Sequence, residues 1–200
     1  ESKILTADIV VKSPGIPDNV PLVLKLKENG IVVISEIEFA AKYTSANIIG
    51  ITGSNGKTTT TTLLHHILKK AGLDVGMAGN IGDSFAAQVA SKTHANYVLE
   101  LSSFQLDGII DFRCHIAILT NITPDHLDRY NYNFEQYISS KFGIIKNQKS
   151  TDYLIYDADN EAISTWLKNN KVTSKLVPFS VEREVEFGAF LENKQIIINI

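Results

Sequence analysis

The stretch Gly50-Ile51-Thr52-Gly53-Ser54-Asn55-Gly56-Lys57-Thr58 decides the fold of this chain. It joins an apolar run of strand length, residues 47–52, to a periodic segment that begins at Lys57. A strand, a glycine-rich loop and a helix in this order form a phosphate-binding loop, in which backbone N–H groups and the helix N-terminus surround phosphate. In such a loop Lys57 supplies charge and the Thr58 hydroxyl reaches Mg²⁺. The general pattern has glycine where this chain has Ile51, so a chance loop is the alternative.

The segment after the loop is expected to be a helix over residues 57–71. Its apolar residues recur at helical spacing, and Gly72 falls where a C-terminal cap belongs. These apolar residues are Leu63, Leu64, Ile67, Leu68 and Ala71.

The rest of the chain alternates between strand-length and helix-length segments. Strands are expected near 8–12, 31–35, 47–52, 96–101, 114–120 and 153–157, and helices near 57–71, 82–92, 134–147 and 160–170. This alternation predicts βαβ units in an α/β protein, with a mostly parallel sheet and helices on both faces. A domain junction is expected near residue 45, because residues 39–46 separate a short first part from a longer part that opens with the strand into the glycine-rich loop. Residues 1–45 are too few to close a core alone.

Composition narrows the function classes. The formal charge of -3 over 200 residues gives no general attraction to nucleic acid, and the apolar runs are far shorter than the roughly 20 residues of a membrane span. The N-terminus lacks the layout of a secretory signal, so the cytoplasm is the expectation. A monomer is expected as well. Cys114 is the single cysteine, which excludes an internal disulfide, and it is expected to be a small buried residue.

Two side chains that could bind a metal, a glutamate and a histidine, follow strands of the expected sheet. Glu100 ends an apolar strand, and His126 lies in the segment 120–130 after the strand 114–119. Ligands gather at the carboxyl ends of parallel strands, so Glu100 is a candidate for Mg²⁺ and His126 for a metal or a substrate oxygen. For each, a solvated loop side chain is the structural alternative.

Two short loops complete the set. Residues 13–17, with the sequence Ser-Pro-Gly-Ile-Pro, form a turn after a strand, and residues 79–82 read Gly-Asn-Ile-Gly. A turn with free backbone N–H groups at a strand end can bind a diphosphate, although such turns are commonly structural.

Together these segments resemble the Mur ligase family. The loop Thr-Gly-Ser-Asn-Gly-Lys-Thr resembles that of the Mur ligases and of their folylpolyglutamate synthase relatives. The segment Asn-Ile-Thr-Pro-Asp-His-Leu-Asp-Arg-Tyr at 121–130 is similar to the family's histidine segment. The segment Glu-Leu-Ser-Ser-Phe-Gln-Leu at 100–106 resembles the branch that adds D-glutamate.

The resemblance implies a role for each motif. The nucleotide is expected at the loop residues Gly53, Ser54, Asn55, Gly56, Lys57, Thr58 and Thr59. Two Mg²⁺ ions are expected at Thr58, Glu100, His126 and Lys141, and Lys57, His126 and Lys141 are the expected catalytic residues. Substrate contacts are expected from Ser13, Pro14, Gly15, Asn80, Ser102 and Gln105.

The implied reaction is an ATP-dependent ligation in peptidoglycan synthesis. The γ-phosphoryl group of ATP passes to the L-alanine carboxylate of UDP-N-acetylmuramoyl-L-alanine, and D-glutamate attacks the acyl phosphate. By this resemblance, residues 1–45 are the end of a partial Rossmann-like UDP-substrate domain and residues 46–200 belong to an incomplete ATP domain. The amino-acid domain is not represented, so this piece alone is expected to be inactive. The rivals are another Mur ligase, a folylpolyglutamate synthase-like ligase, and a nucleotide-binding module without ligase activity.

Lys141 lies on the apolar side of the helix expected at 134–147, which is an unusual position for a charged side chain. Burial lowers a lysine pKa and leaves free amine that can capture carbon dioxide. The alternative is a lysine whose stem packs on the apolar face while its head reaches water. The resemblance implies the first reading, in which Lys141 is carbamylated and binds or orients the second Mg²⁺.

Overall fold

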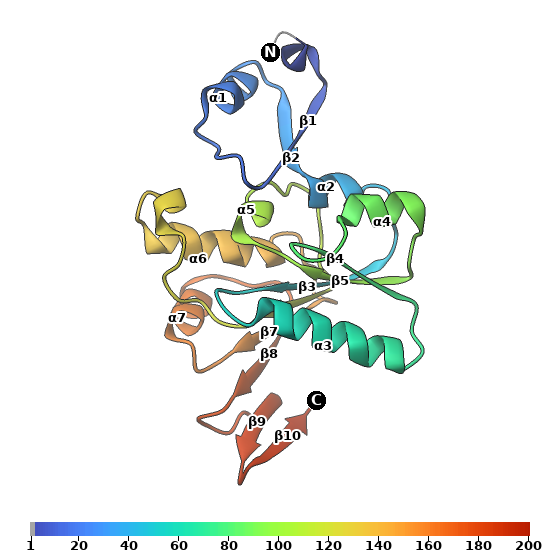
Figure 1. Ribbon diagram of the computed structural model, residues 1–200. Helices are drawn as coiled ribbons and strands as arrows, with labels where there is room; N and C mark the ends of the chain where they lie inside the picture. Colours follow the sequence, from blue (N-terminus) through green and yellow to red (C-terminus); the bar gives the residue numbers. More distant parts are fainter. Residues whose placement is uncertain (1–2) are drawn as a thin grey trace.

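Two separate β-sheets organise the chain in the computed structural model, which describes residues 3–200 (Figure 1). The small sheet pairs β1 (Ile9–Lys12) with β2 (Val32–Ser35) in parallel, with α1 (Pro21–Glu28) between them in the sequence. The large sheet has eight strands: β3 (Asn47–Thr52), β4 (Val75–Gly79), β5 (Asn96–Glu100), β6 (Ile116–Leu119), β7 (Tyr153–Asp157), β8 (Lys175–Ser180), β9 (Gly188–Glu192) and β10 (Gln195–Asn199).

The large sheet is parallel except at its last strand. The strand order is β10-β9-β8-β7-β6-β3-β5-β4, and only β10 pairs in the antiparallel sense, with β9. The prediction of a mostly parallel sheet is therefore confirmed. The strands β5 and β6 flank β3 on either side, so the carboxyl ends of these three strands meet at one edge of the sheet.

Helices cover both faces of the large sheet, as predicted. On one face lies α3, and on the opposite face lie α2, α4, α5 and α6 (Figure 1). The helices after α1 are α2 (Glu36–Ala41), α3 (Lys57–Lys70), α4 (Phe85–Ser91), α5 (Ser103–Leu106), α6 (Phe134–Phe142) and α7 (Glu161–Asn169). Short 3₁₀ turns occupy Ile4–Thr6, Leu127–Tyr130 and Gly143–Ile145, so the helix expected at 134–147 ends at Phe142 and tightens into a 3₁₀ turn.

Fewer apolar residues of α3 pack against the large sheet than the apolar periodicity predicts. Leu64 and Leu68 pack on Ile51, Val75 and Val98. Leu63 and Ile67 are instead exposed, at 58% and 52% of their surface. Residues four apart share one face of a helix, and only one such pair can face a flat sheet. The predicted cap is confirmed, because the chain leaves the helix at Gly72.

The larger core lies on the face of α2, α4, α5 and α6. Its centre includes Tyr97, Leu99, Leu119 and Leu154. Cys114 is fully buried there, and burial raises the pKa of its thiol, which agrees with its expected role as a small core residue.

The helix α2 is tied into the larger core by a buried carboxylate. Glu38 is fully buried, and its two oxygens accept hydrogen bonds from the backbone N–H groups of Ile110, Asp111 and Phe112 at 2.8 to 3.2 Å. A buried charge is stable only when it is hydrogen-bonded in this way. Although α2 precedes residue 45, it therefore packs with the large sheet, and the junction near residue 45 stays a prediction.

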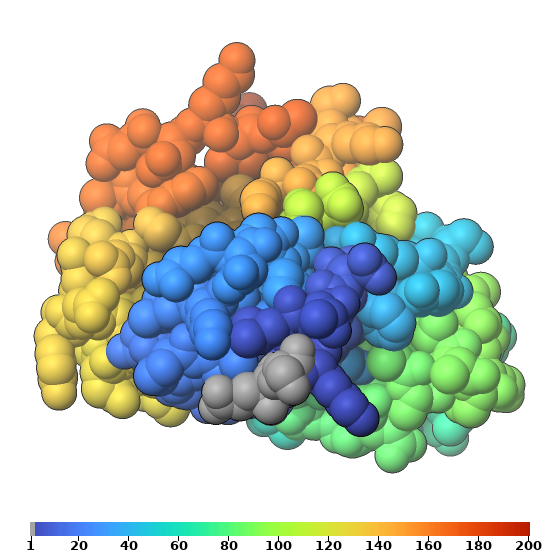
Figure 2. Space-filling model, turned by 90° about the horizontal axis from the view of Figure 1, so that it is seen from above, coloured from blue at the N-terminus to red at the C-terminus, as the bar shows by residue number. Residues whose placement is uncertain are grey.

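The small sheet lies over the middle of the molecule. Seen from above, the residues of the small sheet and α1 (blue) lie between the region of α6 (yellow) and that of α4 (green) (Figure 2). None of the helices within residues 3–200 has the length and apolar content that a membrane span requires.

Candidate nucleotide and substrate site

The phosphate-binding loop forms as predicted between β3 and α3. The loop runs from Gly53 to Gly56, and the 14-residue helix α3 begins at Lys57. Gly56 caps the helix in the left-handed conformation, at φ 81°, and no side chain caps the first turn. The amides of the first turn are thus free to point at an anion, and the helix adds about half a positive charge at this end.

The segment after β6 braces this loop. Asn121 accepts hydrogen bonds from the Ser54 and Asn55 amides, each at 2.9 Å, and Thr120 Oγ1 donates to the Asn55 carbonyl at 2.7 Å. A side chain at Gly53, which has φ 147°, would collide with Thr120. Since two loop amides are engaged here, the amides at the start of α3 are the ones left for phosphate.

Two lysine side chains, from Lys57 and Lys141, lie close to the same backbone carbonyl, that of Gly53. Lys57 Nζ donates to the carbonyl oxygens of Gly53 and Ser54 at 2.8 and 3.0 Å. Lys141 Nζ donates to the Gly53 carbonyl at 2.7 Å and approaches Thr52 Oγ1 at 3.4 Å. The structure therefore brings two sequence-predicted lysines, 84 residues apart in the chain, to one end of the loop.

Lys141 is buried, with 2% of its surface exposed. This rules out the alternative in which its head reaches water. Desolvation by burial, together with the nearby positive charge of Lys57, lowers the pKa of Lys141 to about 7. A substantial share of this amine is consequently neutral near pH 7.

Glu100 joins two other predicted residues at the carboxyl end of β5. Its Oε2 atom accepts a 2.7 Å hydrogen bond from Thr58 Oγ1, and its Oε1 atom accepts a 2.9 Å bond from Asn80 Nδ2. Glu100 is 2% exposed, so the solvated alternative is wrong for this residue. A hydroxyl and a carboxylate are the hard oxygen donors that Mg²⁺ prefers, and this ion usually takes its other ligands from water and phosphate. Within residues 3–200 no group of three or more His, Cys, Asp or Glu side chains is placed to hold a metal ion.

His126 lies in the braced segment but faces outward. Its side chain is 58% exposed, and Nε2 is 3.6 Å from Asp125 Oδ2. Its backbone is left-handed, at φ 49°, a conformation that costs energy in a residue other than glycine and is common at functional sites. The ring of Phe104 lies 5.5 Å from the His126 ring. Within residues 3–200 no hydrogen bond joins His126 to Lys141, and their joint role at a second Mg²⁺ stays a prediction.

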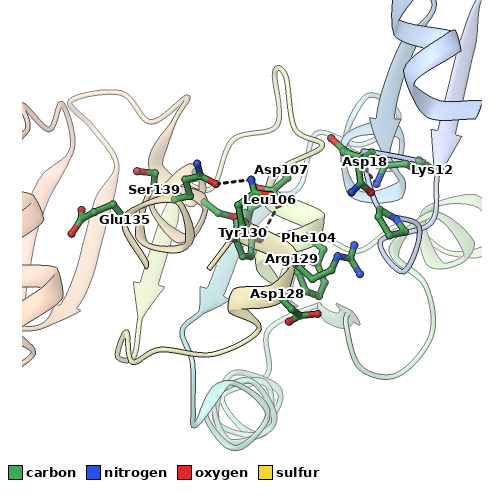
Figure 3. A pocket seen from close by; sticks show the side chains of 16 residues that line it. Lys12, Asp18, Phe104, Leu106, Asp107, Asp128, Arg129, Tyr130, Glu135 and Ser139 are labelled. Carbon is green, nitrogen blue, oxygen red and sulfur yellow. Dashed lines mark hydrogen bonds and ion pairs between the residues drawn. The ribbon is translucent and has the colours of Figure 1, made fainter. Parts of the chain in front are cut away.

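The predicted turn after β1 lies beside a pocket whose other walls are α5, α6 and the 3₁₀ turn Leu127–Tyr130. The Ile16 amide donates to the Ser13 carbonyl at 3.0 Å, and Arg129 donates to the Pro14 carbonyl at 3.4 Å. The pocket encloses about 760 Å³ (Figure 3). Its lining includes Lys12, Pro17, Phe104, Asp107, Arg129 and Tyr130.

Ser102 and Gln105 form a capping box at the start of α5. Ser102 Oγ accepts from the Gln105 amide, while Gln105 Oε1 accepts from the Ser102 amide at 2.9 Å. This reciprocal pair satisfies two amides at a helix N-terminus. Ser102 and Gln105 therefore have a structural role that was not predicted from the sequence.

Two groups of residues at the site were not predicted from the sequence. The Tyr137 hydroxyl lies 3.1 Å from Ser54 Oγ, which itself donates to the Thr123 carbonyl, so Tyr137 braces the phosphate loop from α6. Asp107 accepts from Tyr130 at 2.9 Å and from Ser140 at 2.6 Å, and burial raises the pKa of its carboxyl. Tyr137, Asp107 and Ser140 lie outside the motifs, and Tyr130 ends the segment 121–130 without a role of its own in the sequence-based prediction.

The fold and this site define a phosphate-loop α/β protein whose anion site is bordered by Glu100 and two lysines. Residues 51–196 match the family described as the Mur ligase middle domain. The chain belongs to the Mur ligase family.

Known proteins similar to this chain include one ligase of known sequence and two solved structures. The UDP-N-acetylmuramoylalanine--D-glutamate ligase of Christiangramia forsetii is 60% identical over 200 residues, which is all of this chain and 45% of that protein. The Neisseria meningitides UDP-N-acetylmuramate:L-alanyl-gamma-D-glutamyl-meso-diaminopimelate ligase has a TM-score of 0.67 at 17% identity, over 96% of this chain and 65% of that one. MurF ligase from Thermotoga maritima in complex with ADP has a TM-score of 0.59 at 18% identity, over 97% of this chain and 58% of that one. The two structures support the fold, and the chain spans about 45% of the length of the curated relative.

Proposed function

We propose that this chain is part of an ATP-dependent ligase that joins D-glutamate to UDP-N-acetylmuramoyl-L-alanine in peptidoglycan synthesis. The observation that carries the proposal is the 60% identity to a ligase of that name over the whole chain. The grouping of Lys57, Thr58, Glu100 and Lys141 around one loop supports it, because this grouping suits phosphoryl transfer.

The reaction requires one anion to attack another. The substrate carboxylate attacks the γ-phosphorus of ATP, the bond to the bridging oxygen breaks, and ADP leaves. The amine of D-glutamate then attacks the acyl carbon, loses a proton and expels phosphate, so an amide forms. Lys57 and the N-terminal amides of α3 would offset the negative charge and hold the phosphoryl group in line.

The Mg²⁺ that ATP requires would be held by Thr58 and Glu100. When bound there, the ion neutralises charge on the phosphate oxygens. Asn80 donates to Glu100, so it orients this carboxylate as well as being a proposed substrate contact.

Lys141 and His126 are proposed to serve the acceptor carboxylate. The neutral amine of Lys141 can attack carbon dioxide and lose a proton, and the product is a carbamate anion. Such an anion would hold or orient a second Mg²⁺ with His126. It would also remove the repulsion that now exists between the ammonium of Lys141 and that of Lys57.

The remaining site residues are proposed to bind substrate. The turn of Ser13, Pro14 and Gly15 is proposed to contact the diphosphate. Since Gln105 Oε1 is engaged with Ser102, the Gln105 Nε2 group is the part left for a substrate oxygen. In this scheme residues 1–45 end the UDP-substrate domain and residues 46–200 belong to the ATP domain, in a monomer that works in the cytoplasm.

The experiment is a phosphate-release assay on the full-length protein. Release of phosphate from ATP should require both UDP-N-acetylmuramoyl-L-alanine and D-glutamate. A nucleotide-binding module without ligase activity would hydrolyse ATP at the same rate without them. Release with another amino acid but not with D-glutamate would instead indicate a different Mur ligase.

A further inference from the structure

Arg129 links the turn after β1 to the loop that carries His126. Its guanidinium carbon lies 4.3 Å from the centroid of the Phe104 ring, and its Nη2 donates a long hydrogen bond of 3.4 Å to the Pro14 carbonyl. The ring of His126 lies 5.5 Å from the same Phe104 ring. One aromatic side chain therefore contacts both the cation and the predicted catalytic histidine, as the close view shows for Arg129 and Phe104 (Figure 3).

The backbone fixes this arrangement. Phe104 lies on the short helix α5, four residues after Glu100, and Arg129 lies in the 3₁₀ turn Leu127–Tyr130. This turn has left-handed residues at both ends, His126 at φ 49° and Asn131 at φ 54°. A conformation of this kind persists only where surrounding contacts hold it, and the Phe104 contacts supply such support.

The turn after β1 is also held by contacts of its own. Lys12 Nζ donates to the Ile16 carbonyl at 2.6 Å and pairs with Asp18 at 2.9 Å, while the Ile16 amide closes the turn on Ser13. Arg129 adds a contact from this turn to the 3₁₀ turn Leu127–Tyr130 and to α5. A planar guanidinium can stack on a ring and still donate from its edge, which a lysine ammonium cannot do.

We propose that Arg129 is a positioning residue that couples the turn at Ser13–Gly15 to His126 through Phe104. This inference rests on the proposed function, in which the turn holds the diphosphate and His126 serves the carboxylate at the other end of the same substrate. Fixing the distance between these two contacts orders the UDP-linked substrate. The phosphate loop is braced by Asn121, at the start of the segment that carries Arg129, so this tie is expected to affect the UDP-linked substrate more than ATP.

The test replaces the guanidinium and keeps its charge. In the full-length protein, Arg129→Lys should raise KM for UDP-N-acetylmuramoyl-L-alanine about tenfold and leave KM for ATP within about twofold, because only stacking and one hydrogen bond are lost. The matched control is Arg183→Lys, since Arg183 also donates to a carbonyl, Ala158, at 2.8 Å, but is 63% exposed. Phe104→Leu should reproduce the effect, and the double variant should be no worse than the poorer single one. An unchanged KM, an equal rise for ATP, or additive losses would overturn the inference.

A second readout does not depend on activity. Hydrogen exchange of the Ile16 amide should accelerate in Arg129→Lys and stay unchanged in Arg183→Lys. Equal exchange in both variants would contradict the tie. If the unaltered protein makes no product while exchange still responds to Arg129→Lys, the proposed function fails and the tie itself stands.

Discussion

The hydroxyl of Thr58 donates a 2.7 Å hydrogen bond to Oε2 of Glu100, and this contact joins the start of α3 to the end of β5. The two residues are 42 positions apart in the chain. They meet because β5 pairs with β3, and β3 leads directly into the phosphate loop. The proposed metal site is therefore a consequence of strand order.

Lys57→Ala should reduce ligation by about 10²- to 10³-fold or more, since removing even one donor that stabilises transition-state charge typically costs that much. The measurement is kcat in the full-length protein. Lys69→Ala is the control, because Lys69 lies exposed in the last turn of the same helix. Near-normal turnover by Lys57→Ala would rule out the phosphate-loop assignment.

Glu100→Gln should raise the Mg²⁺ concentration that gives half-maximal activity by about tenfold, because one charged ligand becomes neutral at nearly the same size. A Mg²⁺ titration at saturating ATP measures this change, and a chelator should abolish activity in both proteins. Glu192→Gln is the control, since Glu192 is an exposed acidic residue at the end of β9. An unchanged Mg²⁺ requirement would show that Glu100 does not serve the metal.

Lys141→Ala should lose ligation, and a short-chain carboxylic acid should restore part of it by taking the place of the carbamate. The assay compares kcat with and without added acid, and Lys168→Ala, at an exposed position on α7, is the control. Undiminished activity of Lys141→Ala would eliminate a catalytic role. A loss that no small acid rescues would argue against the carbamate.

Lys141→Met should stabilise the fold, and more so at pH 7 than at pH 10. The pKa of Lys141 is lowered to about 7 from 10.5, so the unfolded chain binds this proton more tightly than the folded one. The lysine consequently destabilises the fold below pH 10.5, with the full cost present below pH 7, at about 1.4 kcal/mol per pKa unit. Thermal midpoints in carbon dioxide-free buffer measure the gain, with Lys168→Met as control. An equal gain at both pH values, or a loss at pH 7, would contradict the burial argument.

Much of the site was predictable because its residues follow strands. The carboxyl ends of neighbouring parallel strands meet at one edge, so Thr52, Glu100 and Asn121 could be placed together once the strands were recognised. The burial of Lys141 was predictable as a position on an apolar helix face. Whether its head reached water was not, because that depends on Thr52 and Gly53, about 88 residues away.

Other features were hidden because tertiary packing alone decides them. The hydrogen bonds from the amides of residues 110–112 to Glu38 join segments more than 70 residues apart. Neither segment has a sequence pattern that predicts contact with the other. The apolar positions Leu63 and Ile67 fit the helical period as well as Leu64 and Leu68 do, yet only the second pair faces the sheet. The strands β4, β8, β9 and β10 and the helices α1, α2 and α5 were also not predicted, because they are short or lack a clear period.

The central claim is that the protein carrying this chain joins D-glutamate to UDP-N-acetylmuramoyl-L-alanine. The most direct test is mass spectrometry of the product formed by the full-length protein with ATP, the UDP-linked substrate and an equimolar mixture of D-glutamate, L-glutamate and L-lysine. One product is expected, with the mass of the glutamate adduct, and it should be lost when D-glutamate alone is left out. A product that survives without D-glutamate, or ADP formed without any amide, would contradict it.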